Sequence, residues 1–291
     1  MFELFAQSAF SGVLAGAYYA LIALGLALVF GTMRVINLAH GELVLLAAYV
    51  AYSAENKLHL DPLASLPLAV AVVGLTSIAV YGLLSRIKKD RELNSLILTF
   101  GLGVIMTNAI LMIWSADIHS TSVPWHHDAI ILADLLFAMN SEVFFGVAGL
   151  VVVAGLWWWL EKTWYGRALR AVASNRDAAK LMGINPQFTE ILSFAVAGLL
   201  ASVAGIAIYS AKVIQPSLGH HLTVKAFIIT VLAGMGSVPG VLLGGMLLGI
   251  VENLTVTLAS SALQELAGMV LFLVVLLVMP SGLFGRVRRR G

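Results

Sequence analysis

The polar residues whose chemistry could matter lie at the edges of apolar segments. Asn37, His40 and Glu42 fall within six residues, directly after a long apolar stretch. Asn is a favoured N-cap, so we predict that Asn37 caps a helix with His40 in its first turn. Glu42 would then lie near the positive end of the helix dipole, where a carboxylate is stabilised. The cluster, which also includes Gly41, is either a well-capped helix start or part of a solute pathway.

A second cluster is the glycine-rich segment 234–245, and its polar and small residues suit two roles. Gly and Ser allow helices to approach closely, and Pro239 suits the first turn of the following helix. Free N–H groups at that helix start could bind a carboxylate or carbonyl group of a solute, although tight packing alone also explains the pattern. Thr99 and Asn108 could line a pore or form hydrogen bonds between helices. The residues of this segment with a candidate pathway role are Gly234, Gly236, Ser237, Pro239 and Gly240.

Motifs for catalysis or nucleotide binding are absent from the sequence. There is no phosphate-binding loop of the type G-x-x-x-x-G-K-[ST], no H-E-x-x-H and no G-x-S-x-G. The chain has no cysteine, which excludes disulfides and thiolate metal sites. His126, His127 and Asp128 are adjacent, but no matching ligands follow at a clear spacing. We expect no catalytic residue, no metal and no cofactor in this chain.

The composition requires lipid as the solvent for much of the surface. Hydrophobic residues make up 60% of the 291 positions and charged residues only 11%, with a mean hydropathy of +0.97. A soluble protein has about 45–50% apolar and about 25% charged residues. No soluble fold of this length buries so much apolar surface, so we expect a multi-pass membrane protein.

The basic residues are distributed asymmetrically along the chain. Thirteen of the 17 Lys and Arg residues lie in three short patches, whereas residues 116–140 contain none. The positive-inside rule therefore predicts that the patches face the cytoplasm. The patches are Arg86, Lys88, Lys89 and Arg91; Lys162, Arg167, Arg170, Arg176 and Lys180; and Arg286, Arg288, Arg289 and Arg290.

Hydropathy predicts an all-α polytopic protein with about eight transmembrane helices in a single domain, residues 1–291. The predicted spans are Phe10–Phe30, Pro67–Leu84, Ser95–Ser115, Val143–Leu160, Phe188–Ala211 and Leu263–Met279. Three apolar stretches are shorter or interrupted, namely Leu43–Ala54, Lys225–Met235 and Val238–Val251. Parity of the crossings requires the last two to return to the side they came from. We therefore predict a broken or re-entrant helix in each half, which is typical of a translocation site.

The long basic loop, about residues 162–187, is predicted to contain one helix that ends at Gly183. Such a helix is either a basic amphipathic helix on anionic lipid or a docking element for a cytoplasmic partner. The candidate coupling residues are Arg167, Arg170, Asn175, Arg176, Asp177, Lys180, Gly183 and Asn185.

Three stretches resemble the LivH-type permeases of branched-chain amino-acid ABC importers. They are Ala20–Gly31 continuing to Val35–Glu42, Arg170–Asn185, and Lys225-Ala-Phe followed by Val231–Gly240 and Gly244-Gly245. In order, they extend over nearly the whole chain.

The resemblance implies a permease subunit in a bacterial inner membrane that works by ATP-driven alternating access. It implies a second, LivM-like permease, two cytoplasmic ATP-binding subunits that dock on the loop, and a periplasmic solute-binding protein. Importers of urea or short amides are also similar, so the solute stays open.

A secondary transporter or channel working alone is the main rival from another class. A carrier coupled to ions would hold several acidic residues inside its spans, and here Glu42 is nearly the only one. Glu190, Glu252 and Glu265 lie near predicted helix ends. A membrane-embedded enzyme is a third alternative, and no catalytic motif supports it.

Overall fold

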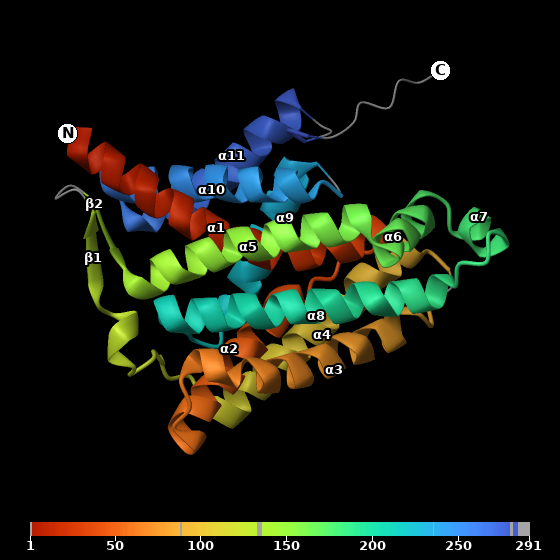
Figure 1. Cartoon of the computed structure of the whole chain (residues 1–291), viewed down its shortest axis with the longest axis horizontal. Coiled ribbons are helices and arrows are strands. Elements are labelled where there is room, and N and C mark those ends of the chain that lie inside the picture. The colour runs from red at the N-terminus through yellow and green to blue at the C-terminus, as the bar shows by residue number, and fades with distance from the viewer. Residues whose placement is uncertain (1, 88, 133–135, 235, 280–281, 285–291) are drawn as a thin grey trace.

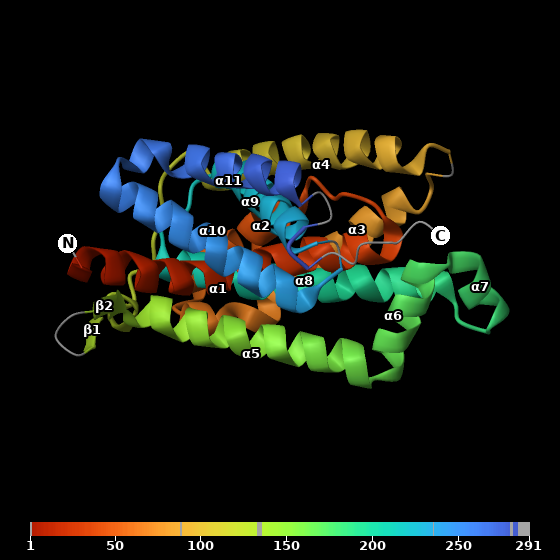
Figure 2. The ribbon, with the colours of Figure 1, turned by 90° about the horizontal axis from the view of Figure 1, so that it is seen from above.

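The structure is a computed structural model that describes residues 2–87, 89–132, 136–234, 236–279 and 282–284. Lys88, Met235 and the basic residues at 286–290 lie outside the described residues. In the described part, long helices lie side by side along the longest axis of the molecule (Figure 1). Figure 2 shows α4 along one side and α5 along the opposite side.

The elements in chain order are these. The α-helices are α1 (Phe2–Met33), α2 (His40–Leu58), α3 (Leu66–Leu84), α4 (Arg91–Trp114), α5 (Asn140–Lys162), α6 (Trp164–Ser174), α7 (Arg176–Leu181), α8 (Pro186–Ala211), α9 (Leu218–Ala233), α10 (Val238–Leu258) and α11 (Gln264–Val278). Short 3-10 helices are η1 (Pro62–Ser65), η2 (Pro124–His126) and η3 (Ser261–Leu263). The strands β1 (Ala129–Leu132) and β2 (Leu136–Met139) form an antiparallel hairpin.

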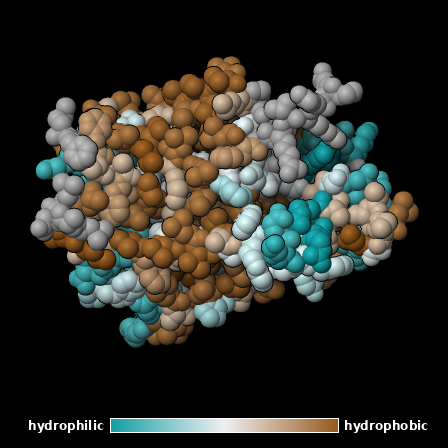
Figure 3. All heavy atoms as spheres, turned by 45° about the horizontal axis from the view of Figure 1, so that its top comes forward, coloured by the Kyte–Doolittle hydropathy of each residue, from teal (hydrophilic) through white to brown (hydrophobic). Residues whose placement is uncertain are grey.

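The prediction of an all-α polytopic membrane protein is confirmed. Seven helical segments of the described chain are long and apolar enough to cross a membrane. The C-terminal ends of the six predicted spans lie within three residues of the ends observed. Apolar side chains cover the middle of the face drawn in Figure 3, and polar groups gather toward its ends. This banding is the one expected for a protein that crosses a bilayer.

The predicted helix break near Gly234 is present, but the second helix is longer than predicted. Gly234 and Gly236 have positive φ angles of 79° and 90°, which end α9 before α10 begins at Val238. The prediction stopped at Val251, whereas α10 continues for 21 residues to Leu258 and is long enough to cross. It continues because Asn253 and Thr255 donate hydrogen bonds to carbonyl groups of the preceding turn. The polar residues that ended the apolar pattern are therefore satisfied within the helix.

The first interrupted helix, α2, is also longer than the predicted Leu43–Ala54. It begins at His40 and continues through polar residues to Leu58, where His59 adopts a left-handed conformation. Most of α2 is buried, together with α1 and α8, at the centre of the molecule. Its polar residues would be costly against lipid. They are tolerated because α2 is surrounded by other helices.

The glycines of α1 and α10 allow these two helices to cross in direct backbone contact. A Cβ atom on Gly12 would lie 2.6 Å from the Ile250 Cα atom, and one on Gly245 would lie 2.7 Å from the Gly16 carbonyl oxygen. Gly12 and Gly16 on α1, like Gly245 and Gly249 on α10, are four residues apart. This spacing places small residues on one face of each helix, as in close helix pairs in membranes.

The two ends of the molecule differ. The helices α6 and α7 project at one end, and the β1–β2 hairpin lies at the other (Figure 1). We call these the coupling end and the hairpin end. Arg91 on α4 and Arg176 on α7 both contact Glu190, so the first two basic patches meet at the coupling end. The hairpin was not predicted: its strands, Ala129–Leu132 and Leu136–Met139, are apolar but have only four residues each.

Candidate translocation and coupling sites

The segment between α1 and α2 is held by side-chain hydrogen bonds rather than by a simple helix cap. The residue before α2 is Ala39, not Asn37, so the predicted N-cap is wrong by two positions. Asn37 Oδ1 instead accepts a hydrogen bond of 3.1 Å from the Ala39 N–H group. Thr99 Oγ1 on α4 accepts one of 3.1 Å from the Leu38 N–H group. Asn37 and Thr99 are both buried, and together they fix the approach to α2.

His40 and Gly41 join α2 to its neighbours. The His40 Nε2 atom lies 2.8 Å from the Ile22 carbonyl oxygen and donates to it. A Cβ atom on Gly25 would lie 2.5 Å from the His40 ring, so glycine provides the room. The Gly41 N–H group donates to Thr223 Oγ1 on α9 at 2.9 Å. Both residues therefore make contacts between helices. The next residue, Glu42, lines a cavity instead.

Glu42 lines a cavity of about 330 Å³ between α2, α4 and α9. Its side chain is almost completely buried, and Oε2 has no hydrogen-bond partner among the described residues. A Cβ atom on Gly219 would overlap the Glu42 carboxylate, so this glycine provides its space. The remaining lining is mainly apolar, with Asn108 as the other predicted pathway residue. The other lining residues are Leu38, Phe100, Gly103, Val104, Thr107, His220, Thr223, Val224 and Phe227.

The glycine-rich turn lies apart from Glu42, beside a second cavity at the coupling end. Ser237 Oγ accepts a hydrogen bond of 3.1 Å from the Gly240 N–H group, and Pro239 lies in the first turn of α10 as predicted. Gly236 and Val238 line this cavity of about 120 Å³ together with residues of α1, α5 and α6. A Cβ atom on Gly240 would lie 2.6 Å from the Ala233 carbonyl oxygen, so the turn is closely packed.

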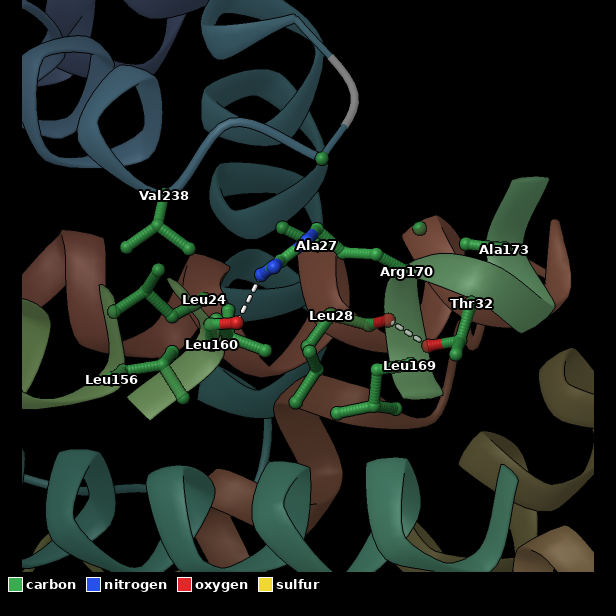
Figure 4. Close-up of a pocket in the computed structure, with 12 residues that line it drawn as sticks. Leu24, Ala27, Leu28, Thr32, Leu156, Leu160, Leu169, Arg170, Ala173 and Val238 are labelled. Atoms are coloured by element: carbon green, nitrogen blue, oxygen red, sulfur yellow. Dashed lines mark hydrogen bonds between the residues drawn. The ribbon is translucent and has the colours of Figure 1, made fainter. Parts of the chain in front are cut away.

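Figure 4 shows how α6 contributes to the second cavity. The Arg170 side chain reaches across it and donates to the Leu160 carbonyl oxygen at the end of α5. Thr32 donates to the Leu28 carbonyl oxygen on α1. Leu24, Leu156 and Leu169 supply apolar walls. The turn after α9 and the first helix of the basic loop therefore share one packed site.

The basic loop forms two helices instead of the one predicted. Asn175 separates α6 from α7 in an extended conformation, with φ −154° and ψ 110°. Its Oδ1 atom accepts hydrogen bonds from the Asp177 and Ala178 N–H groups at 3.1 and 3.0 Å. The helix breaks there because Asn caps a new helix better than it continues the old one. Gly183, with φ 80°, ends the second helix as predicted.

The end of the loop is capped in the same manner. Asn185 Oδ1 accepts hydrogen bonds of 3.0 and 3.3 Å from the Gln187 and Phe188 N–H groups, so it is the N-cap of α8. Arg167 donates to the Lys162 carbonyl oxygen, while Asp177 and Lys180 are exposed on α7. The exposed charges are therefore available to a partner.

A buried carboxylate ties the loop to the membrane helices, and sequence reasoning missed it. Glu190 on α8 is 1% exposed and accepts a hydrogen bond of 2.9 Å from Arg176 Nε on α7. Arg91 on α4 lies 3.7 Å away, and the Tyr81 hydroxyl group on α3 donates at 3.2 Å. The sequence signal that could have predicted this ion pair was the position of Glu190, an acidic residue that closely follows the basic loop. Glu190 thus connects α3, α4, α7 and α8.

The tip of α7 presents two apolar residues that the predicted set omitted. Leu181 is 89% exposed and Met182 is 82% exposed. They lie at the coupling end, beside exposed charged side chains. Burying such a pair against another protein is favourable, and an exposed apolar tip on a polar surface is typical of an interaction site.

At the hairpin end, an extended loop is fixed to the helices by Glu55. Its carboxylate accepts hydrogen bonds from Thr121 Oγ1, the Ser122 N–H group and the Tyr209 hydroxyl group at 2.8, 2.7 and 2.9 Å. His126 in the same loop is buried, which lowers its pKa, although the Asp61 carboxylate 3.7 Å away acts in the opposite direction. No group of metal-binding side chains occurs in the residues that the structure describes.

Comparison with known proteins identifies the family. The family described as "Branched-chain amino acid transport system / permease component" matches residues 8–279. The chain belongs to this permease family. The seven apolar spans among its described residues agree with a multi-pass membrane permease of an ABC transport system.

Several curated relatives of this permease match over almost their whole length. The high-affinity branched-chain amino acid permease protein LivH of Escherichia coli K12 is 32% identical over 98% of this chain and 97% of its own. BraD of Pseudomonas aeruginosa, with the same description, is 29% identical over 96% and 95%. A probable LivH of Methanocaldococcus jannaschii is 28% identical over 91% and 88%.

Proposed function

We propose that this permease imports branched-chain or related hydrophobic amino acids through a bacterial inner membrane by ATP-driven alternating access. The observation that carries the proposal is the similarity to LivH of Escherichia coli K12 over 98% of this chain and 97% of the relative. Because the match extends over all the spans, it supports the same type of transport rather than a shared fragment. The 291 residues act as one membrane domain.

The proposed assembly contains a second, LivM-like permease, two ATP-binding subunits and a periplasmic solute-binding protein. ATP is bound and hydrolysed by the partners, so this chain is not an enzyme and needs no cofactor of its own. The cytoplasm lies at the coupling end, where the basic residues gather, and the solute arrives at the hairpin end.

The proposed pathway runs past the start of α2. Glu42 and Asn108 face the solute, while Asn37, His40, Gly41 and Thr99 hold the cavity wall in place. The turn formed by Gly234, Gly236, Ser237, Pro239 and Gly240 closes the coupling end of the pathway. Its packing against α6 and α1 supports this role, because a movement of α6 would be transmitted to the turn.

Coupling to the ATP-binding subunits is assigned to α6 and α7. The exposed Leu181 and Met182 dock in the ATP-binding subunit. A displacement of α7 by that subunit is transmitted to α8 through the ion pair between Arg176 and Glu190. Rigid transmission needs capped helices and ionic contacts between elements, and this loop has both.

The test is ATP-dependent uptake of labelled leucine by proteoliposomes that contain the complete importer. The double variant Leu181→Asp/Met182→Asp removes the apolar tip without touching a buried residue. Leu181→Met/Met182→Leu is the matched control, because it keeps the apolar surface. We expect the Asp variant to lose uptake and the bound ATP-binding subunits, and the control to transport normally.

Three results would overturn the proposal. Uptake that persists without ATP would indicate a secondary transporter or channel. Normal uptake by the Asp variant would exclude the α7 tip as the docking element. Labelled urea transported in preference to leucine would retain the ATP-driven permease and replace the proposed solute.

A further inference from the structure

The Glu42 carboxyl group has no cationic partner in the described structure. Its Oε2 atom has no hydrogen bond and the side chain is only 3% exposed. The lining of its cavity contains no Lys or Arg within the described part of the chain. A buried carboxylate in apolar surroundings is costly unless a cation or donor meets it. The Glu42 carboxyl group could therefore accept a hydrogen bond from a positively charged ligand, since no Lys or Arg of the described chain lines its cavity.

The other acidic residues of the described interior have either a cationic partner or several hydrogen-bond donors. Glu252 pairs with Lys225 and accepts from the Tyr19 hydroxyl group at 3.1 Å. Glu190 pairs with Arg176 and Arg91. Glu55 accepts hydrogen bonds from Thr121 and Ser122 in the loop and from the Tyr209 hydroxyl group on α8. Against this pattern, Glu42 is exceptional, and it is also the acidic residue that lines the cavity of about 330 Å³.

The rest of the cavity has the shape and chemistry for an aliphatic side chain. Phe100 and Val104 of α4 and Val224 and Phe227 of α9 contribute apolar lining. The volume lies at the lower end of the range for small-molecule sites, which is about 300–1,000 Å³. Asn108 and His220 add polar groups to the lining that can donate hydrogen bonds to an anion.

We propose that Glu42 binds the α-ammonium group of a zwitterionic amino acid, while the α4–α9 wall holds the solute's aliphatic side chain. This proposal rests on the proposed function and names the recognition group within it. Asn108 and His220 receive the solute carboxylate. Gly219 is a positioning residue, because its missing side chain leaves the space that the Glu42 carboxylate occupies.

This arrangement selects against two other classes of solute. A neutral amide such as urea has no cation for Glu42, so it leaves the buried charge unpaired. A carboxylic acid that lacks the amino group adds a second negative charge to the cavity. Discrimination therefore comes from the unpaired charge as much as from the contact formed.

Binding to the purified membrane complex of permeases and ATP-binding subunits, without the solute-binding protein, tests the ammonium contact directly. The probes are leucine, 3-methylbutylamine (ammonium without carboxylate) and 4-methylpentanoate (carboxylate without ammonium). We expect thermal stabilisation by leucine and by the amine, and none by the acid. Equal stabilisation by the amine and the acid would overturn the proposal, as would stabilisation by phospholipid alone with no response to leucine.

The variant Glu42→Gln keeps the shape of the side chain and removes its charge. Leucine uptake in proteoliposomes should fall by roughly tenfold to a hundredfold, the range expected for a lost hydrogen bond to a charged group. ATP hydrolysis stimulated by the loaded binding protein should persist, because the coupling end is unchanged. Glu92→Gln is the matched control, since Glu92 is exposed at the start of α4 and lies outside the cavity.

The outcomes separate this proposal from the proposed function. Wild-type uptake by Glu42→Gln refutes the ammonium contact and leaves the permease assignment intact. Absence of ATP-dependent leucine uptake in the wild type refutes the permease assignment itself. If Glu42→Gln does not assemble, the three-probe comparison on the wild-type importer decides.

Discussion

The crossing of α1 and α10 provides the sharpest structural prediction. Replacing Gly12 by Ala would put a Cβ atom 2.6 Å from the Ile250 Cα atom and 2.9 Å from the Gly249 carbonyl oxygen. Ordinary contacts of a Cβ atom are 3.4–4 Å, so the two backbones must separate by about 0.8 Å. No flexible side chain can move aside, because the opposing atoms belong to the backbone.

The expected cost follows from this overlap. Forcing extra atoms into a packed site costs about 1–3 kcal/mol, and a contact between two backbones favours the middle of that range or above. Ala also has a higher helix propensity than Gly by about 1 kcal/mol, which partly conceals the loss. Gly155→Ala on α5 removes this complication, because it has the same propensity gain and nothing within 4 Å of the new Cβ atom.

We therefore expect Gly12→Ala to be about 2 kcal/mol less stable than Gly155→Ala, each measured against the wild type. The assay is reversible unfolding of the purified permease in mixed micelles by added denaturing detergent, followed by circular dichroism. If the two variants change the free energy of unfolding equally, to within about 0.5 kcal/mol, the close crossing does not constrain the fold. A change in uptake without a change in stability would also contradict the packing argument.

Three further predictions concern the ends of the molecule. Glu190→Gln should destabilise the protein by about 1–2 kcal/mol, because Arg176 loses a charged acceptor but is itself half exposed. Amide hydrogen exchange in α7 should become faster. Unchanged exchange would contradict the conclusion that Glu190 holds α7 against α8. Asn175→Ala should cost about 1 kcal/mol by loss of the α7 cap, whereas Asn175→Asp should retain it, as thermal unfolding will check. Burial lowers the pKa of His126, so the unfolded loop binds a proton more readily than the folded one. Its contribution to stability is complete above the ordinary His pKa of about 6.5 and is lost as the pH falls below it. Hydrogen-exchange protection factors, which correct for the intrinsic effect of pH on exchange, should therefore fall in residues 119–128 at pH 5.5 in the wild type but not in His126→Phe.

The sequence alone determined the class of protein and the approximate position of its helices. Long apolar segments must be helical in lipid, because every backbone polar group needs a partner within its own segment. The same local reasoning located the break after Ala233 and the stop at Gly183, since both depend on glycine at positive φ. Charge asymmetry predicted that the basic patches lie on one side, and residues of the first two patches do meet at Glu190. These properties are local in the chain, so no tertiary contact was needed to infer them.

Only the tertiary structure decided which polar residues face a cavity and which are satisfied by neighbours. His40 and Glu42 are two positions apart in one motif, yet His40 donates to Ile22 while Glu42 Oε2 has no partner. The sequence placed Glu190 near a helix end, but it could not show that Arg91, 99 positions earlier in the chain, lies beside it. The physical reason is that burial and charge pairing depend on distant segments, which a hydropathy pattern cannot bring together.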